Sequence, residues 1–139
     1  MKRVILALVV IVIAGVLYWG LLRPEPDVAT AQKGTPMVEI TIPVLSANAQ
    51  AGAAAFSANC AVCHGDNAAG SLGSGPPLVH KIYEPGHHGD MSFVLAARRG
   101  VQAHHWPFGN MPPVEGIKDD EIANIIVYIR ELQRANGIS

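Results

Sequence analysis

Two cysteines and a histidine form a cluster whose spacing fits a specific chemistry. The stretch Cys60-Ala61-Val62-Cys63-His64 places two thiols three positions apart and an imidazole directly after the second thiol. This CxxCH spacing is typical of covalent attachment of c-type haem. Each thiol adds to one vinyl group of the porphyrin, and the adjacent imidazole can then ligate the iron through one ring nitrogen. We expect the other ring nitrogen of His64 to donate to an acceptor that fixes the tautomer.

Zinc sites and redox dithiols use similar cysteine spacings. The chain contains two cysteines in all, so no second pair is available to complete a zinc tetrad, and no βαβ pattern indicates a thioredoxin fold. The cysteine count also excludes a disulfide framework. We therefore predict one haem c, covalently bound through Cys60 and Cys63, with His64 as the proximal iron ligand.

The elements that must position this cluster are predicted to be helices. Residues 46–59 are rich in alanine, run directly into the haem-binding motif and have Ser46 or Asn48 as a candidate N-cap. Residues 119–135 begin with acidic side chains, which suit the start of a helix. An apolar stripe with helical period follows, made of Ile122, Ile125, Ile126, Ile129 and Leu132, with Tyr128 beside it.

Two glycines indicate how these helices are packed and bounded. Gly52 shares one helix face with Phe56, and a glycine inside a helix costs roughly 1 kcal/mol relative to alanine. We therefore expect the first and last helices to cross closely at Gly52. A third, short helix is predicted over residues 91–99, with Asp90 as its cap and Gly100 as its C-terminal stop.

The composition indicates one small domain with an N-terminal extension. Charged residues make up 15 % of the 139 residues and the formal net charge is −1, with no basic block, so nucleic acid is not an expected partner. Residues 46–139 form the predicted domain. Glycine- and proline-rich loops leave it too little regular structure for stability without a large buried prosthetic group.

The N-terminal residues 4–22 form an uncharged, apolar run. As a helix this run approaches the roughly 30 Å thickness of the bilayer hydrocarbon. Lys2 and Arg3 precede it, so the positive-inside rule leaves the N-terminus in the cytoplasm and exports the rest of the chain. A cleavable signal peptide is the alternative, because residues 29–31 offer a small-residue cleavage site. We favour retention and assign residues 1–22 to a membrane anchor.

Residues 23–45 are predicted to form a proline-containing tether. Four prolines in this segment disfavour a continuous helix and favour extended backbone. Val38, Ile40 and Ile42 alternate with other residues in a short strand-like pattern, which also fits a segment that lies against the domain.

The chain from Ser46 to Gly137 resembles a class I cytochrome c. Three features carry the resemblance: the Gly52/Phe56 helix that leads into CxxCH, the stretch Gly75-Pro76-Pro77-Leu78, and the stretch Gly109-Asn110-Met111-Pro112-Pro113 before the Tyr128 helix. The resemblance implies an all-α, haem-wrapping fold with crossing N- and C-terminal helices. It also implies that the Pro76 carbonyl accepts a hydrogen bond from the His64 ring and that Met111 is the distal iron ligand.

A methionine in this position also makes chemical sense. Its thioether is a soft, neutral ligand, and methionine opposite histidine raises the reduction potential. The glycine and prolines around Met111 suit a loop that carries the sulfur to the iron, whereas Met91 beside Asp90 suits ordinary packing at a helix start.

Five further histidines lie between residues 80 and 105, namely His80, His87, His88, His104 and His105. Three interpretations are open: bis-histidine haem ligation, a copper or zinc site built from the pairs, and polar loop residues near the haem edge, which we favour. Tyr83 and Trp106 are candidate haem-pocket residues, as walls or as donors to the propionates.

Two axial protein ligands would leave the iron no open site for a substrate, so the sequence predicts electron transfer and not enzymatic catalysis. We expect a single-pass protein of the bacterial cytoplasmic membrane with its haem domain on the periplasmic side. Its expected partners are redox proteins such as a respiratory complex, a dehydrogenase or a terminal oxidase. One alternative is a haem enzyme or gas sensor with a displaceable Met111. Another is an electron-delivering subunit of a larger complex.

Overall fold

The computed structural model describes residues 12–13, 15–20 and 33–139. Residues 12–13 and 15–20 are helical. Most of the predicted membrane span at residues 4–22 lies outside the described residues, as do residues 23–32 of the predicted tether. In the part of the chain that is described, no helix is both long enough and apolar enough to cross a bilayer.

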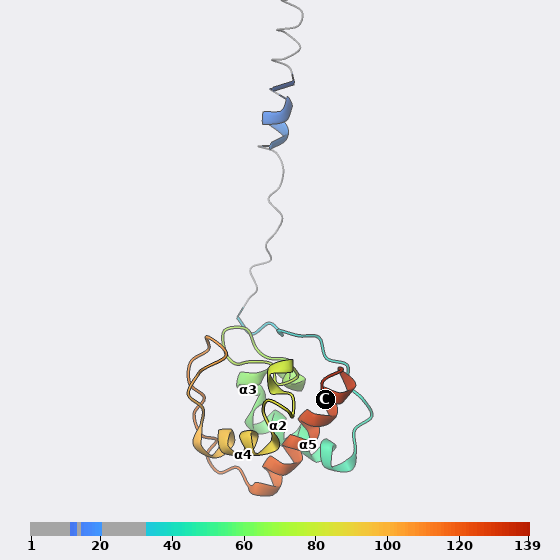
Figure 1. Ribbon diagram of the computed structural model, residues 1–139, viewed down its shortest axis with the longest axis vertical. Helices are drawn as coiled ribbons and strands as arrows, with labels where there is room; N and C mark the ends of the chain where they lie inside the picture. The colour runs from blue at the N-terminus through green and yellow to red at the C-terminus, as the bar shows by residue number, and fades with distance from the viewer. Residues whose placement is uncertain (1–11, 14, 21–32) are drawn as a thin grey trace, which may run out of the picture. The chain divides into compact units, whose positions relative to one another are not determined.

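The chain divides into two units, Met1–Ala31 and Gln32–Ser139. The second unit consists of helices joined by long loops (Figure 1). Its described residues contain no strand, only the isolated bridge pairs Ser71–Gly75 and Val101–Met111, as the all-α prediction requires. The helices are α2 (Ala47–Asn59), α3 (Ala61–His64), η1 (Asp66–Ala68), η2 (Lys81–Tyr83), α4 (Asp90–Arg99) and α5 (Asp119–Ala135).

Helices α2 and α5 cross at Gly52, as the sequence predicts. A Cβ atom at this position would overlap the backbone carbonyl of Asn124 on α5, so a side chain here would force the helices apart. One turn further along α2, Phe56 packs against Tyr128 with 5.8 Å between the ring centroids. The crossing therefore joins the first and last helices of the domain through backbone contact and an aromatic pair.

The apolar stripe of α5 forms much of the core. All five of its aliphatic residues are buried, and Tyr128 is buried with them. Ala49 and Phe56 of α2 belong to the same core. The Ser46 side chain accepts a hydrogen bond from the Ala49 N–H at 3.3 Å, which confirms Ser46 as the N-cap of α2.

Helix α4 has the predicted C-terminus but a different N-cap. Gly100 ends the helix with a φ of 74°, a backbone conformation that favours glycine. The prediction that Asp90 is the N-cap is wrong, because Gly89 holds that position without a side-chain hydrogen bond and Asp90 is the first helical residue. The Asp90 carboxylate instead accepts a hydrogen bond from Arg130 of α5 at 2.8 Å. The Asp90 side chain thus forms an ion pair with a distant residue and does not cap its own helix.

Residues 33–45 of the predicted tether lie along the domain. The backbone N–H groups of Met37 and Val38 both donate to the Ala69 carbonyl, at 3.0 and 3.2 Å. Thr41 exchanges two hydrogen bonds of 2.9 Å with the Asn136 side chain. No strand forms within residues 33–45. Partly buried Ile40 packs on the core, so the alternating pattern reflects burial of one side against the domain.

The crossing at Gly52 can be tested by Gly52→Ala. Alanine favours a helix by roughly 1 kcal/mol, but overpacking typically costs about 1–3 kcal/mol. The atoms that the new Cβ would meet are backbone atoms of Asn124, which cannot easily move aside. The cost of the clash should therefore exceed the gain in helix propensity, and the denaturation midpoint of the haem-loaded protein should fall. Ala51→Gly at the adjacent exposed position is the control and should cost about 1 kcal/mol through helix propensity alone. A Gly52→Ala protein as stable as the parent would contradict the close crossing.

Candidate haem site

The domain encloses an apolar cavity of about 590 Å³ beside the CxxCH motif. Side chains from α2, α3, α4, α5 and the loops between them form its wall, among them Phe56, Leu78, Phe93, Val101 and Ile126. Cofactor sites in proteins are typically concave, mostly apolar and roughly 300–1,000 Å³ in size. The cavity therefore has the dimensions and the lining that a haem requires.

Both cysteines of the motif lie on the wall of this cavity. Cys60 ends α2 and begins α3, and the His64 N–H donates to the Cys60 carbonyl at 2.9 Å, so one helical turn brings the motif together. Burial and the neighbouring Cys63 raise the pKa of the Cys60 thiol to about 11. A thiol of this kind stays protonated at neutral pH.

His64 is buried in the cavity wall with its ring fixed by the backbone. Its Nδ1 atom lies 2.9 Å from the Pro76 carbonyl oxygen. Because a carbonyl can only accept, Nδ1 carries the proton and Nε2 is left to ligate a metal. Burial lowers the pKa of His64, which favours the neutral ring that iron binding needs. Gly75 next to Pro76 lets this loop approach Cys63, whose carbonyl a Cβ would meet at 2.5 Å.

Met111 lies on the wall of the same cavity. Its backbone exchanges two hydrogen bonds of 2.9 Å with Val101, which ties its loop to the segment after α4. Gly100 has no side chain where the Met111 carbonyl approaches it. The fold thus holds both predicted axial residues, His64 and Met111, at one cavity from positions far apart in the sequence.

Tyr83 and Trp106 also line the cavity. Burial raises the pKa of the Tyr83 hydroxyl, and the Trp106 side chain beside it acts in the opposite direction. The Trp106 indole nitrogen is buried near the Tyr83 hydroxyl, but it has no hydrogen-bond partner among the described residues. An unpaired buried donor costs free energy, and a haem propionate is an acceptor that would satisfy it. This orphaned donor is a second indication that the cavity is shaped for a polar-edged cofactor.

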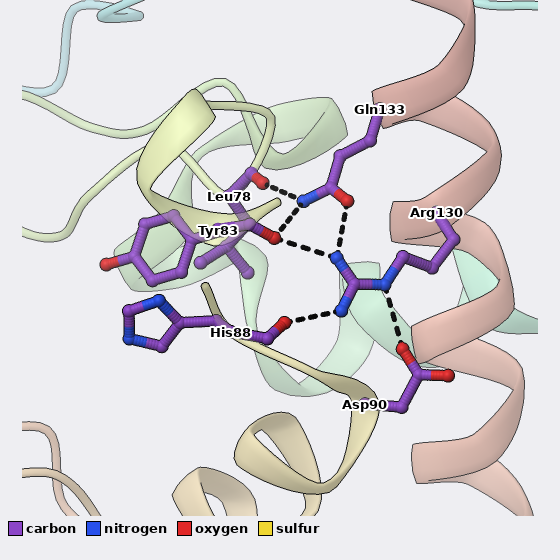
Figure 2. Close-up of polar contacts among 6 residues, drawn as sticks. All are labelled: Leu78, Tyr83, His88, Asp90, Arg130 and Gln133. Carbon is purple, nitrogen blue, oxygen red and sulfur yellow. Dashed lines mark hydrogen bonds and ion pairs between the residues drawn. The ribbon is translucent and has the colours of Figure 1, made fainter. Parts of the chain in front are cut away.

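The loop between residues 78 and 90 is held by two polar residues of α5 (Figure 2). Arg130 donates to the carbonyls of Tyr83 and His88 at 2.7 and 2.6 Å, and to the carboxylate of Asp90. Gln133 accepts a hydrogen bond of 2.6 Å from Arg130 and donates to the carbonyls of Tyr83 and Leu78, at 3.0 and 2.8 Å. Four backbone and side-chain acceptors on one loop are therefore satisfied from one helix.

Sequence reasoning missed Arg130 and Gln133. Both are buried, and they follow Ile126 and Ile129 by four residues, so they continue the apolar stripe of α5. A charged or amide side chain on the buried face of a helix needs a partner, and that position is the signal that could have found this network.

The histidines divide into one group and one separate residue. His88, His104 and His105 line the cavity, and His87 lies beside His88 with 4.6 Å between ring centroids. His80 instead packs edge-on against Trp106 at 5.2 Å. The fold thus brings four of the five histidines to one edge of the cavity.

A family model described as cytochrome c matches residues 49–133 of the chain. The chain belongs to the cytochrome c family. Its fold and its CxxCH motif agree with that assignment, so the protein is a haem-based electron carrier with haem c attached through Cys60 and Cys63. A search among curated proteins found no match to this chain.

The Arg130 network can be tested by Arg130→Lys, which keeps the charge but cannot reproduce the planar set of donors. Loss of several hydrogen bonds to a buried charge should lower the free energy of unfolding by about 2–4 kcal/mol. Arg134→Lys, one turn later on the exposed side of α5, is the matched control and should change stability little. Chemical denaturation of the two haem-loaded variants measures the difference. Equal stability of both variants would show that the network contributes nothing.

Proposed function

We propose that this protein is a membrane-anchored monohaem class I cytochrome c whose iron is ligated by His64 and Met111. The observation that supports this best is the shared cavity. His64, with Nε2 free, and Met111, on a loop tied to Val101, both line it. When bound, haem c supplies an iron that accepts and releases one electron. The side chains around the haem would set the ligation of the iron and its reduction potential.

The two proposed ligands and the cavity wall would act together. His64 and Met111 would both ligate the iron, which would leave no coordination site for a substrate and would favour electron transfer over catalysis. The thioether would stabilise the ferrous state. The apolar wall would also favour ferrous haem, because it excludes water and ferrous haem carries less charge than ferric haem. Both effects raise the reduction potential.

Electrons would enter and leave at the edge that carries the thiols. Cys63 is exposed, and Val62 beside it is 82 % exposed. A haem attached at these cysteines would therefore have its attachment edge near the surface, where a redox partner could approach. The proposed partners are a respiratory complex, a dehydrogenase or a terminal oxidase.

A haem enzyme or gas sensor is the second candidate function. It is favoured by one observation, that His104 and His105 line the cavity together with Met111. If Met111 dissociated, one of these imidazoles could assist chemistry on a small ligand. Slow CO binding to the reduced protein would support the carrier, whereas rapid binding would support the sensor or enzyme.

Ligation by Met111 can be tested with Met111→His. Replacing a thioether by imidazole should lower the reduction potential strongly and abolish the sulfur-to-iron charge-transfer band of the oxidised protein. A redox titration and the absorption spectrum measure both effects. Met91→His, at an exposed methionine on α4, is the matched control and should leave both unchanged. An unchanged potential in Met111→His would exclude Met111 as the ligand.

The proposal also places the anchor in the cytoplasmic membrane and the haem domain on the periplasmic side. The uncharged run at residues 4–22 and the basic residues before it support an anchor that leaves the haem domain outside the cytoplasm. A dedicated subunit of a larger complex would use the same anchor. Copurification of an oxidase or dehydrogenase with the intact chain would distinguish that subunit from a free carrier.

Retention of the anchor predicts that the haem-stained protein stays in the membrane fraction after carbonate washing. Its intact mass should include residues 1–31 and one haem. A variant in which a cleavable signal peptide replaces residues 1–22 should release haem-stained protein into the soluble periplasmic fraction. A parent protein that is soluble and begins after residue 31 would instead establish cleavage.

A further inference from the structure

Two loops at the edge of the haem cavity bring three histidines together. One ring nitrogen from each of His87, His88 and His105 lies within 4.8 Å of the other two. The ring centroids of His87 and His105 are 5.4 Å apart, and those of His88 and His105 are 5.2 Å apart. Because one loop precedes α4 and the other follows it, this convergence is produced by the fold and not by sequence adjacency alone.

The central imidazole is already oriented as a metal ligand. Nδ1 of His88 lies 2.7 Å from the Ile82 carbonyl oxygen. A carbonyl can only accept, so Nδ1 carries the proton and Nε2 keeps a free lone pair. Metal-binding histidines commonly have their second nitrogen held in this way, which fixes the tautomer and the ring direction. His88 therefore already has the tautomer and the ring orientation of a metal ligand.

Both loops are anchored beneath these side chains. Arg130 of α5 donates to the His88 carbonyl at 2.6 Å, which fixes the backbone of the first loop (Figure 2). In the second loop the Ala103 N–H donates to the Asn110 side chain at 2.9 Å. Backbone positions held in this way reduce the entropy that a bound ion would have to remove. The site is thus partly preorganised before binding.

The neighbouring histidines affect the protonation of His105. Partial desolvation and the neighbouring His104, His88 and His87 lower the pKa of His105, because a proton on one ring disfavours a proton on the next. A metal ion competes with protons for the same nitrogen lone pairs.

We propose that His87, His88 and His105 form a binding site for one divalent transition-metal ion at the edge of the haem cavity. Three imidazoles without a thiolate or carboxylate suit Cu²⁺ and Zn²⁺, and the Irving–Williams order favours Cu²⁺. Tetrahedral metal–nitrogen bonds of about 2.0–2.1 Å place the nitrogens about 3.3 Å apart. Nitrogens that now lie up to 4.8 Å apart must therefore approach by up to about 1.5 Å. His87 and His105 are exposed, so their side chains have room for this movement.

The proposed site is separate from the axial ligands of the haem but shares a wall with it. His88 and His105 line the same cavity as His64 and Met111. His104 lies next to the three ligands, with 4.2 Å between its ring centroid and that of His105, and is the nearest imidazole for a fourth position. Water can fill that position instead.

The test uses the full-length, haem-loaded protein without a polyhistidine tag. Titration with Zn²⁺ by calorimetry should give one site per chain, and Cu²⁺ should displace the Zn²⁺. Pulsed electron paramagnetic resonance of the copper form should detect imidazole nitrogen couplings. His87→Ala and His105→Ala should each weaken binding at least about tenfold, and the double variant should lose the site. An unchanged haem absorption spectrum in these variants would show that the haem site is intact.

His80→Asn is the matched control. It removes a histidine from the same segment but lies outside the group, and asparagine can replace the hydrogen bond that His80 accepts from the Ile82 N–H. This variant should bind both ions with the affinity of the parent. The proposal is overturned if the parent takes up no stoichiometric ion, if the double variant binds as the parent does, or if His80→Asn loses affinity equally.

Discussion

The structure depends on the contact between the first and last helices of the domain. At Gly52 the backbone of α2 reaches the carbonyl of Asn124 on α5, with no side chain between them. This contact brings Phe56 and the end of α2 next to the buried stripe of α5, and the CxxCH motif follows directly from that end. The position of the cysteines is therefore set by a helix crossing and not by their own short helix, which is a single turn.

The rest of the domain is irregular, and helix α5 substitutes for the missing secondary structure. Loop carbonyls need hydrogen-bond partners when they are covered, and these loops supply only some of them internally. Arg130 and Gln133 supply these partners to Leu78, Tyr83 and His88. One helix thus serves two purposes, with an aliphatic stripe for the core and two polar side chains that fix the cavity edge.

The sequence predicted the features that local chemistry determines. The bounds of α5 and the N-cap of α2 follow from periodicity, acidic first-turn residues and Ser46, and these agree with the structure. Local patterns indicated that one side of residues 38–42 is buried and placed Arg130 on the buried face of α5. They could not reveal which groups these residues contact, because those partners are distant in sequence. Asp90 shows the same limit, because its distant partner outweighed its cap propensity. The approach of Pro76 to His64 entered through family resemblance alone.

The Arg130 network also has a consequence for the order of assembly. A chain synthesised from its N-terminus presents Cys60, Cys63 and His64 well before Arg130. Until the final helix arrives, the Tyr83 and His88 carbonyls lack the donors that hold them in the finished domain. The last helix therefore completes this edge of the cavity only after the attachment motif has been made.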